Sequence, residues 1–324
     1  FGEGGEGYVP GEGVGALVLK SLAKAVEDGD HVYGVIKGSS VNHGGKTNGY
    51  TVPNPVAQAD LIKEAIAKSN IDPRTISYVE AHGTGTSLGD PIELAGLSKA
   101  FARHTPDKQF CPIGSVKSNI GHLEAAAGVA GVSKILLQMQ HQQLVPSIHS
   151  ARLNPNIDFE DSPFYVQREL TEWKRPQLAS NGSVQEYPRR ASISSFGAGG
   201  ANAHLILEEF LPASDTQPAE QPGAQVIVLS AKNQERLDGY VGSMKGFIEA
   251  AMVENVSAGI PLPSLRDFSY TLQVGRAALE QRLAIVAGGL EELLDILTQY
   301  QSGEPSVPGL YQGNVKRDSQ HARL

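Results

Sequence analysis

Apolar residues recur along the first two thirds of the chain with two alternating periodicities. Runs rich in β-branched residues predict strands, several of them buried on both faces. Apolar residues three and four positions apart predict helices. The predicted strands span 14–19, 32–41, 76–81, 112–116, 191–196 and 204–208, and the predicted helices span 56–69, 89–103 and 122–140. This alternation predicts an α/β layered domain whose working loops lie at the strand ends.

A proline-rich polar segment then interrupts the pattern and predicts a connection between domains. Beyond it, the apolar stripe from Leu237 to Ala251 predicts a long amphipathic helix. Strands are predicted at 225–230, near 283–287 and at 310–315, with a helix near 290–300. The expected organisation is one domain over 1–210, a linker over 211–224 and a second, smaller α/β subdomain over 225–324.

The composition is that of an ordinary soluble globular protein and narrows the classes of function. Because 27 Lys and Arg stand against 35 Asp and Glu, the net charge is −8, which argues against a nucleic-acid-binding surface. Cys111 is the only cysteine, so an intrachain disulfide and a multi-cysteine zinc site are excluded, and we expect no metal. No apolar run approaches the ~20 residues that span a bilayer, and no secretory leader is visible. We expect a cytoplasmic protein without a membrane span.

Two candidate motifs favour ordinary structural interpretations. The segment GEGGEG at 2–7 matches the dinucleotide-binding fingerprint, but it does not follow a strand or open a helix, so we interpret it as turns. Cys111 lies at the start of a predicted strand, without a helix N-terminus or cationic neighbours to stabilise a thiolate. A buried structural thiol is therefore favoured over a nucleophile.

Histidines stand in two glycine-containing motifs. In VEAHGTGT (79–86), His82 follows a predicted strand and precedes glycines that let a substrate approach. In KSNIGHLEAAAG (117–128), the alanine-rich run predicts a helix with Gly121 as N-cap, His122 in the first turn and Glu124 at the third position. The helix dipole would keep His122 neutral, and Lys117 could order the site or pair with Glu124. Each motif is equally consistent with a structural turn or an ordinary capped helix.

A third glycine-rich turn, SSFGAGGANAH at 194–204, lies between two predicted strands. Its glycines can expose backbone N–H groups, which are the donors from which oxyanion holes are built. A tight hairpin is the alternative interpretation. We expect His204, beside the strand LILEE, to be structural.

Together these motifs resemble the C-terminal half of a β-ketoacyl synthase, the ketosynthase domain of modular polyketide synthases. The matching segments are GYVPGEGVGALVLK (7–20), VEAHGTGTSLGDPIE (79–93), GSVKSNIGHLEAAAG (114–128) and SSFGAGGANAHLILEE (194–209), in the family's order and spacing. The segment VNHGGKTNGYTVPNP (41–55) is similar to bacterial synthases whose acyltransferase is a separate protein. Residues 225–315 resemble the subdomain that flanks such ketosynthases.

The resemblance implies a thiolase-like layered fold, in which two similar α/β halves form the core. It implies decarboxylative Claisen condensation of an enzyme-bound acyl chain with a malonyl unit, which is carried on the phosphopantetheine of an acyl carrier protein. No cofactor is expected to bind directly. The site residues that it implies are His82 and His122 as the catalytic pair, Lys117 and Glu124 as supporting charges, Thr84 and Thr86 at the phosphopantetheine arm, and Phe196 as gate and oxyanion-hole donor.

The implied chemistry requires a particular arrangement of the two histidines. Loss of CO₂ from a malonyl thioester leaves an enolate, whose negative charge lies largely on one oxygen. Neutral imidazoles that donate N–H groups in a dry pocket stabilise such a charge where it develops. We therefore expect His82 and His122 to be uncharged and to converge on a common point beside Phe196.

The nucleophilic cysteine of the family stands on a strand-to-helix elbow in the N-terminal half, and Cys111 does not match that position. We therefore expect the chain to be inactive alone, either as a fragment or as one half of a split enzyme. The resemblance implies four partners: the N-terminal half of the ketosynthase, the acyl carrier protein, an acyltransferase acting in trans, and a second copy of the complete domain in a homodimer.

Two alternative functions share this fold. A non-elongating ketosynthase would bind or gate carrier-bound intermediates, but such proteins usually lose part of the Cys-His-His set, and both histidines are present here. A thiolase would need a second cysteine near its C-terminus, and the sequence has none there.

Overall fold

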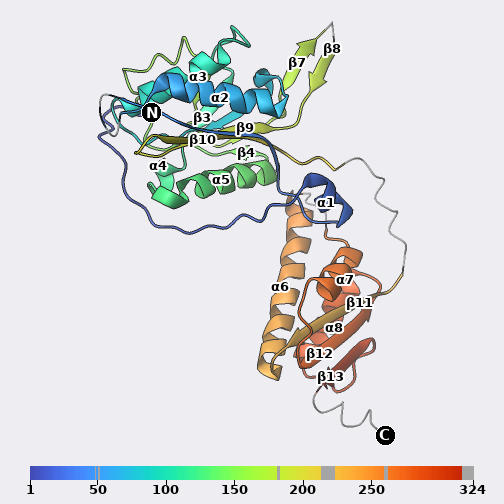
Figure 1. The fold of residues 1–324 in the computed structure, drawn as a ribbon. Helices are drawn as coiled ribbons and strands as arrows, with labels where there is room; N and C mark the ends of the chain where they lie inside the picture. The colour runs from blue at the N-terminus through green and yellow to red at the C-terminus, as the bar shows by residue number, and fades with distance from the viewer. Residues whose placement is uncertain (48, 50–51, 181–182, 213–222, 259–261, 316–324) are drawn as a thin grey trace. The chain divides into compact units, whose positions relative to one another are not determined.

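The computed structural model describes residues 1–47, 49, 52–180, 183–212, 223–258 and 262–315 (Figure 1). The chain divides into two compact units, Phe1–Ala213 and Ser214–Leu324. Residues 213–222, which make up most of the predicted linker, lie outside the described residues, and its bounds stay a prediction. Among the described residues, no helix has both the length and the apolar character needed to cross a bilayer.

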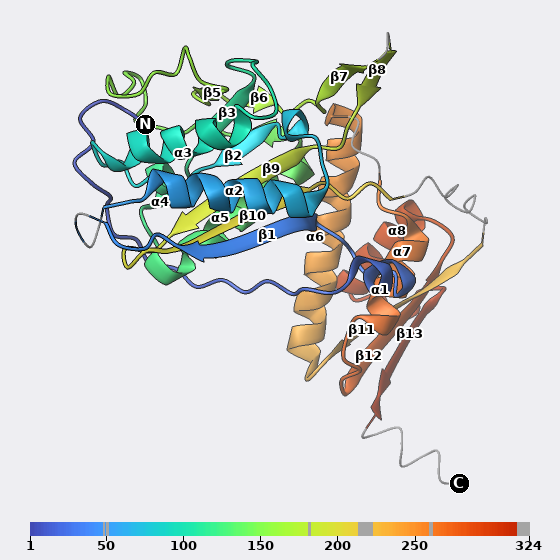
Figure 2. The same ribbon diagram turned by 45° about the horizontal axis from the view of Figure 1, so that its top comes forward.

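A six-stranded mixed sheet forms the centre of the first unit (Figure 2). Its strands run in the order β1 (Val35–His43), β10 (Ala201–Glu208), β9 (Arg190–Phe196), β2 (Tyr78–Glu80), β3 (Cys111–Gly114) and β5 (Phe164–Val166). β1, β10 and β9 pair antiparallel, whereas β9, β2, β3 and β5 pair parallel. The parallel strands therefore bring the carboxyl ends of β2 and β3 to one edge beside the end of β9.

Helices cover both faces of this sheet (Figure 1). α2 (Pro55–Ser69) and α3 (Gly89–Phe101) lie on one face, and α5 (Ala127–His141) lies on the other. α2 begins where Asn54 accepts hydrogen bonds from the backbone N–H groups of Val56 and Ala57, with proline at its first position. The smaller elements are α1 (Leu22–Glu27), α4 (Lys117–Ile120), 3₁₀ turns at Pro73–Thr75 and Glu124–Ala126, and strands β4 (Gln143–Leu144), β6 (Thr171–Glu172), β7 (Gln177–Ser180) and β8 (Ser183–Glu186).

Each face of the sheet has its own apolar core. Under α2 and α3, the core includes Ile62, Val79 and Leu97. Under α5, the core includes Ile135 and the single tryptophan, Trp173, whose indole N–H donates to Ser77 Oγ at 2.9 Å. Core residues on both faces mean that the short central strands are buried on two sides, as their continuous apolar sequence predicts.

The predicted strand at 14–19 is not formed, and this prediction is wrong for the described structure. The segment forms no regular secondary structure, and Val14 and Val18 are each 99% exposed. A strand exists only where a second strand supplies hydrogen bonds, and no strand among the described residues pairs with this one. The β-branched apolar pattern is typical of a buried strand, but the segment is exposed among the described residues.

The predicted helix at 122–140 begins five residues later than expected, at Ala127. Gly121 has φ +76° and closes α4 instead of opening a helix, and Glu124 also has a left-handed φ of +50°. Two left-handed residues interrupt helical propagation between α4 and α5. The expected placements of Gly121 as N-cap, His122 in the first turn and Glu124 at the third helical position are therefore wrong.

The second unit is a small α/β fold with its own core. Its antiparallel sheet has the order β11 (Gln225–Ala231), β12 (Gln281–Ala287) and β13 (Leu310–Asn314). Its helices are α6 (Gln234–Ala258), α7 (Leu265–Val274) and α8 (Leu290–Gln301). The predicted strands and the helices at 237–251 and 290–300 are confirmed, whereas α7 was not predicted.

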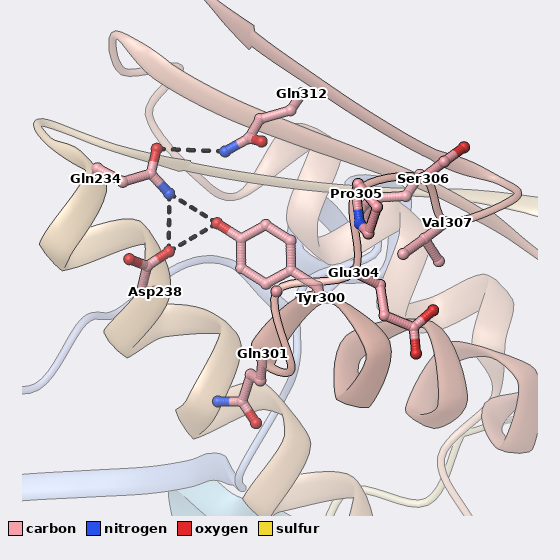
Figure 3. A pocket seen from close by; sticks show the side chains of 11 residues that line it. Gln234, Asp238, Tyr300, Gln301, Glu304, Pro305, Ser306, Val307 and Gln312 are labelled. Atoms are coloured by element: carbon pink, nitrogen blue, oxygen red, sulfur yellow. Dashed lines mark hydrogen bonds between the residues drawn. The ribbon is translucent and has the colours of Figure 1, made fainter.

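A polar cavity of about 650 Å³ in this unit is bordered by the start of α6 and the end of α8 (Figure 3). The Tyr300 hydroxyl donates to Asp238 Oδ1 at 2.7 Å and accepts from Gln234 Nε2 at 2.7 Å. Gln312 Nε2 on β13 donates to Gln234 Oε1 at 3.2 Å. Burial and the adjacent Asp238 raise the pKa of Tyr300 to about 12. The phenol is therefore a neutral donor that connects α8 to α6.

Tyr300→Phe is expected to lower the unfolding free energy of the second unit by about 1 kcal/mol, because it removes a donor and an acceptor from this network. Urea titration followed by circular dichroism measures the loss. Tyr311→Phe is the matched control, since Tyr311 is exposed on β13 and should change stability by less than about 0.5 kcal/mol. Equal losses in the two variants would contradict a structural role for the network.

Candidate active site

Three loops of the first unit meet at the carboxyl ends of β2 and β3. His82 follows β2 by two residues, His122 lies in the β3–α5 connection, and Phe196 ends β9. The ring centroids of His82 and His122 are 5.4 Å apart, with the ring planes 83° apart. The Phe196 ring lies 5.5 Å from that of His82. The structure thus brings together the three residues that the sequence placed on separate segments.

Backbone donors determine which nitrogen of each imidazole carries the proton. The Phe196 N–H donates to His82 Nδ1 at 3.3 Å, and the Glu124 N–H donates to His122 Nδ1 at 2.8 Å. A ring nitrogen that accepts a hydrogen bond cannot also hold a proton, so each neutral ring carries its proton on Nε2. Both histidines are therefore Nε2–H donors. The family resemblance implies the Phe196 N–H as an oxyanion-hole donor; in this structure the group donates to His82 Nδ1.

Burial and nearby cations favour the neutral form of both rings. Desolvation, with additional effects of Lys117 and His122, lowers the pKa of His82 to about 3. Desolvation and Lys117 also lower the pKa of His122, against a smaller opposing effect of Glu124. His82 is consequently uncharged throughout the physiological range.

Lys117 opens α4 and is half-buried beside three carboxylates. Desolvation lowers the pKa of Lys117, and Glu93, Glu80 and Asp90 oppose this effect. Glu124 is exposed, and no ion pair joins it to Lys117 in the described part of the chain. The supporting charges around Lys117 therefore come from β2 and α3, and the expected pairing with Glu124 is not formed.

Two buried acids on α3 hold the loop that carries His82. Glu93 accepts the backbone N–H groups of His82 at 2.7 Å and of Gly83 at 2.8 Å, one on each carboxylate oxygen. Asp90 accepts the Gly85 N–H at 3.0 Å. Neither acid was expected to have a role, although both lie in the motif VEAHGTGTSLGDPIE (79–93). A Glu or Asp on a predicted helix is ordinarily a surface residue, and only the return of the loop onto α3 makes these two acceptors.

The N-terminal glycine-rich segment supports His122. His122 N–H donates to Val9 O at 2.8 Å, and Gly11 N–H donates to His122 O at 3.0 Å. The Tyr8 ring packs against the His122 ring, with the centroids 4.6 Å apart and the planes tilted by 52°. In addition, Gly7 N–H donates to Gly85 O at 3.0 Å in the His82 loop. Residues 7–11, which include the last glycine of the segment interpreted as turns, therefore lie along both histidine loops, a placement that sequence patterns could not reveal.

The two threonines differ in how their side chains are used. Thr86 Oγ1 accepts the Gly89 N–H at 2.9 Å, so it helps to begin α3. Thr84 is half-buried in the same loop, two residues after His82. Both lie in the loop that carries His82.

Cys111 belongs to a different segment from the two histidines and lies in a different environment. It is fully buried at the start of β3, and desolvation raises the pKa of its thiol far above the usual range. A thiol in this environment stays protonated and is a poor nucleophile. Among the described residues, no group of three or more His, Cys, Asp and Glu side chains is arranged to hold a metal ion.

Comparison with known protein families identifies three matches, the last two of which overlap. Residues 33–151 match the β-ketoacyl synthase C-terminal domain, 154–257 match the ketoacyl-synthetase C-terminal extension, and 228–304 match the RhiE-like, KS-MAT linker domain. Among curated proteins, the chain is 58% identical over 99% of its length to polyketide synthase PksL of Bacillus subtilis and 48% identical over 94% to polyketide synthase ThaG of Burkholderia thailandensis. It covers only 7% and 5% of these two relatives.

Solved structures give a corresponding likeness. The ketosynthase from module 6 of the bacillaene synthase of Bacillus subtilis 168 superposes with a TM-score of 0.83 and 44% identity, over 100% of this chain. The oxazolomycin ketosynthase domain OzmH KS7 of Streptomyces albus JA3453 gives 0.84 and 45%, over 97%. These matches cover 53% and 52% of the solved chains, so this chain spans about half the length of a solved ketosynthase. The expected thiolase-like α/β fold class is confirmed by this likeness.

Proposed function

Because the chain belongs to the β-ketoacyl synthase family, as the C-terminal half of a ketosynthase domain of a bacterial modular polyketide synthase, we propose that it supplies the histidine side of a condensing active site. The observation that carries this proposal is the pair of Nε2–H donors on His82 and His122, whose rings lie 5.4 Å apart. Both rings are held neutral by burial, as an enolate-stabilising donor must be.

The proposed reaction is a decarboxylative Claisen condensation. The bond between the carboxylate and the α-carbon of a malonyl thioester breaks, CO₂ leaves, and the electron pair remains as an enolate. Nε2–H groups of His82 and His122 donate to the thioester oxygen on which the charge collects. The enolate carbon then attacks an acyl thioester on a cysteine, forming a carbon–carbon bond and releasing the cysteine thiolate. Donors that are already oriented need no rearrangement as the charge appears.

The other site residues have supporting roles in this proposal. Lys117 adds positive charge beside both rings, which favours their neutral form and stabilises a developing anion. Thr84 and Thr86 contact the phosphopantetheine arm that carries the malonyl unit, and Phe196 gates the pocket from the end of β9. Glu124 acts through its backbone, because its N–H orients His122 while its carboxylate is exposed.

The remaining half of the site must come from residues outside this sequence. Cys111 is a buried, protonated thiol, so the nucleophilic cysteine belongs to the N-terminal half of the ketosynthase. The exposed apolar run that contains Val14 and Val18 supports the need for that half, since such a surface is stable only when covered. We further propose an acyl carrier protein, an acyltransferase acting in trans and a homodimer of the complete domain as partners.

The test uses the complete ketosynthase that contains this chain, supplied with acyl and malonyl groups on acyl carrier protein. We expect loading of the acyl chain, release of one CO₂ for each product and a product extended by two carbons, all measured by mass spectrometry. Transfer of the acyl group without extension would instead support a non-elongating role in binding or gating intermediates. Failure of both loading and extension in a folded protein would contradict the proposal.

A further inference from the structure

A buried charged cluster connects the two histidine loops, and of its members only Glu80 has been described so far, as one of the carboxylates around Lys117. Glu80, the last residue of β2, is 2% exposed. Its Oε2 accepts hydrogen bonds from the Tyr78 hydroxyl and from Lys134 Nζ, both at 2.8 Å. Lys134 Nζ also donates to the Tyr78 oxygen at 2.8 Å, and Lys134 itself is 7% exposed on α5. A buried acid and base of this kind hold their positions because each would be costly to leave unpaired.

The second oxygen of Glu80 connects this cluster to the neighbouring loop. Oε1 accepts the Val116 N–H at 2.6 Å, and Val116 directly precedes Lys117. Glu80 itself stands two residues before His82 on the adjacent strand. One carboxylate therefore joins the chain segment that leads into His82 to the segment that leads into Lys117 and His122. Gly131 of α5 packs closely on its stem, since a Cβ there would lie 3.2 Å from Glu80 Cγ.

The same cluster contributes opposite charges to the surroundings of Lys117. Glu80 raises the pKa of Lys117 and Lys134 lowers it. The remaining charged or titratable groups around Lys117 are Glu93 and Asp90 on α3, and His82 and His122 on the site loops. Replacing Glu80 or Lys134 with a neutral residue of similar size therefore changes the field at Lys117 in opposite directions.

We propose that Glu80 is a positioning residue, which holds the Lys117 turn against the His82 strand through Val116 and sets the charge balance at Lys117 together with Lys134. The inference rests on the proposed function only for the consequence that condensation depends on this positioning. A loop displaced by about 1 Å can cost about 100-fold in rate, so disruption of this contact should be visible in turnover.

The test compares Glu80→Gln, Lys134→Met and Tyr78→Phe in the complete ketosynthase. Glu80→Gln should slow malonyl decarboxylation about tenfold or more at the optimal pH. It should also move the alkaline limb of the pH–rate profile about 0.5–1 pH unit lower, because Lys117 then loses its proton more readily. Lys134→Met should move this limb higher. Tyr78→Phe removes a hydroxyl without changing charge and should leave the limb in place.

A second readout does not depend on activity. Competitive acetylation of Lys117 across pH, followed by mass spectrometry, reports its titration directly and should show the same opposite displacements. If the wild-type protein does not decarboxylate malonyl groups, the proposed function fails while this measurement still tests the inference. A Glu80→Gln and Lys134→Met double variant removes both buried charges, so it should fold even where a single variant does not, and should titrate close to wild type. Three results would overturn the inference: the Lys117 titration moves in the same direction in both single variants, it moves in neither, or the double variant titrates differently from wild type.

Discussion

Replacing His122 with alanine is expected to slow malonyl decarboxylation by the complete ketosynthase about 100- to 1,000-fold. The variant removes one of two preorganised Nε2–H donors, and loss of one such donor raises an activation barrier by about 2.7–4 kcal/mol. His82→Ala should have an effect of the same order, because the Phe196 N–H orients its ring in the same way that Glu124 orients that of His122. Release of CO₂ from malonyl-loaded carrier protein measures both effects.

In a double variant, His82→Ala with His122→Ala, the fold-loss in rate should be smaller than the product of the two single fold-losses. Both donors act on one oxygen, so removing either already destroys the shared site, and residues that act as a unit are not additive. His104→Ala is the matched control, since His104 is exposed beyond the end of α3 and should retain the wild-type rate. Turnover at the normal rate in His122→Ala would remove the basis for condensation chemistry at this site.

Replacing Glu93 with glutamine is expected to remove a pH-dependent contribution to the free energy of unfolding on the order of 3 kcal/mol. Burial raises the pKa of Glu93 from 4.5 to about 7, although the N–H groups of Gly83 and His82 oppose the shift. The folded state therefore binds the Glu93 proton more tightly than the unfolded state does. The resulting stabilisation is fully present below pH 4.5 and is lost as the pH rises to about 7. Glutamine cannot titrate, so the variant lacks this loss.

Urea unfolding followed by the fluorescence of Trp173 measures the effect in the first unit, because Trp173 is the only tryptophan and is 1% exposed. The stability of wild type relative to Glu93→Gln should fall between about pH 4.5 and pH 8.

His204→Asn provides a control of opposite sign. His204 is fully buried 3.0 Å from Ser194 Oγ, and desolvation lowers its pKa from 6.5 to about 3. Wild type should therefore lose stability relative to His204→Asn as the pH falls below 6.5. A parallel pH dependence in wild type and Glu93→Gln would contradict the buried, titrating carboxylate.

Elements that obtain their burial within this chain were predictable from pattern. The predicted helix at 56–69 corresponds to α2 at Pro55–Ser69, and the predicted strand at 191–196 corresponds to β9 at Arg190–Phe196. Their periodicity reflects one apolar face packed on the sheet or two faces packed between helices. The run at 14–19 carries a comparable strand pattern, yet no strand among the described residues pairs with it, and Val14 and Val18 are exposed.

The candidate site was predictable as residue types but not as contacts. Motifs indicated His82, His122 and Phe196, and the structure places the rings of His122 and Phe196 at 5.4 Å and 5.5 Å from the His82 ring. The start of α5 was misplaced because two left-handed residues, Gly121 and Glu124, turn the chain before the helix begins. The partners of Lys117 were wrongly predicted for a related reason, since the acids that raise its pKa lie 24 to 37 residues away in sequence and act on it only after folding.

The order of residue types along the chain was enough to identify the layered α/β class, the family and the chemical groups available for catalysis, because periodicity and motif spacing are local properties. Tertiary structure alone decided the protonated nitrogen of each imidazole, the burial of Glu93 and the joining of two loops by Glu80. The Glu124 N–H lies only two residues from His122, but the partners in the other hydrogen bonds are 11 to 114 residues apart in sequence. A hydrogen bond between such groups forms only when folding brings both atoms within about 3 Å.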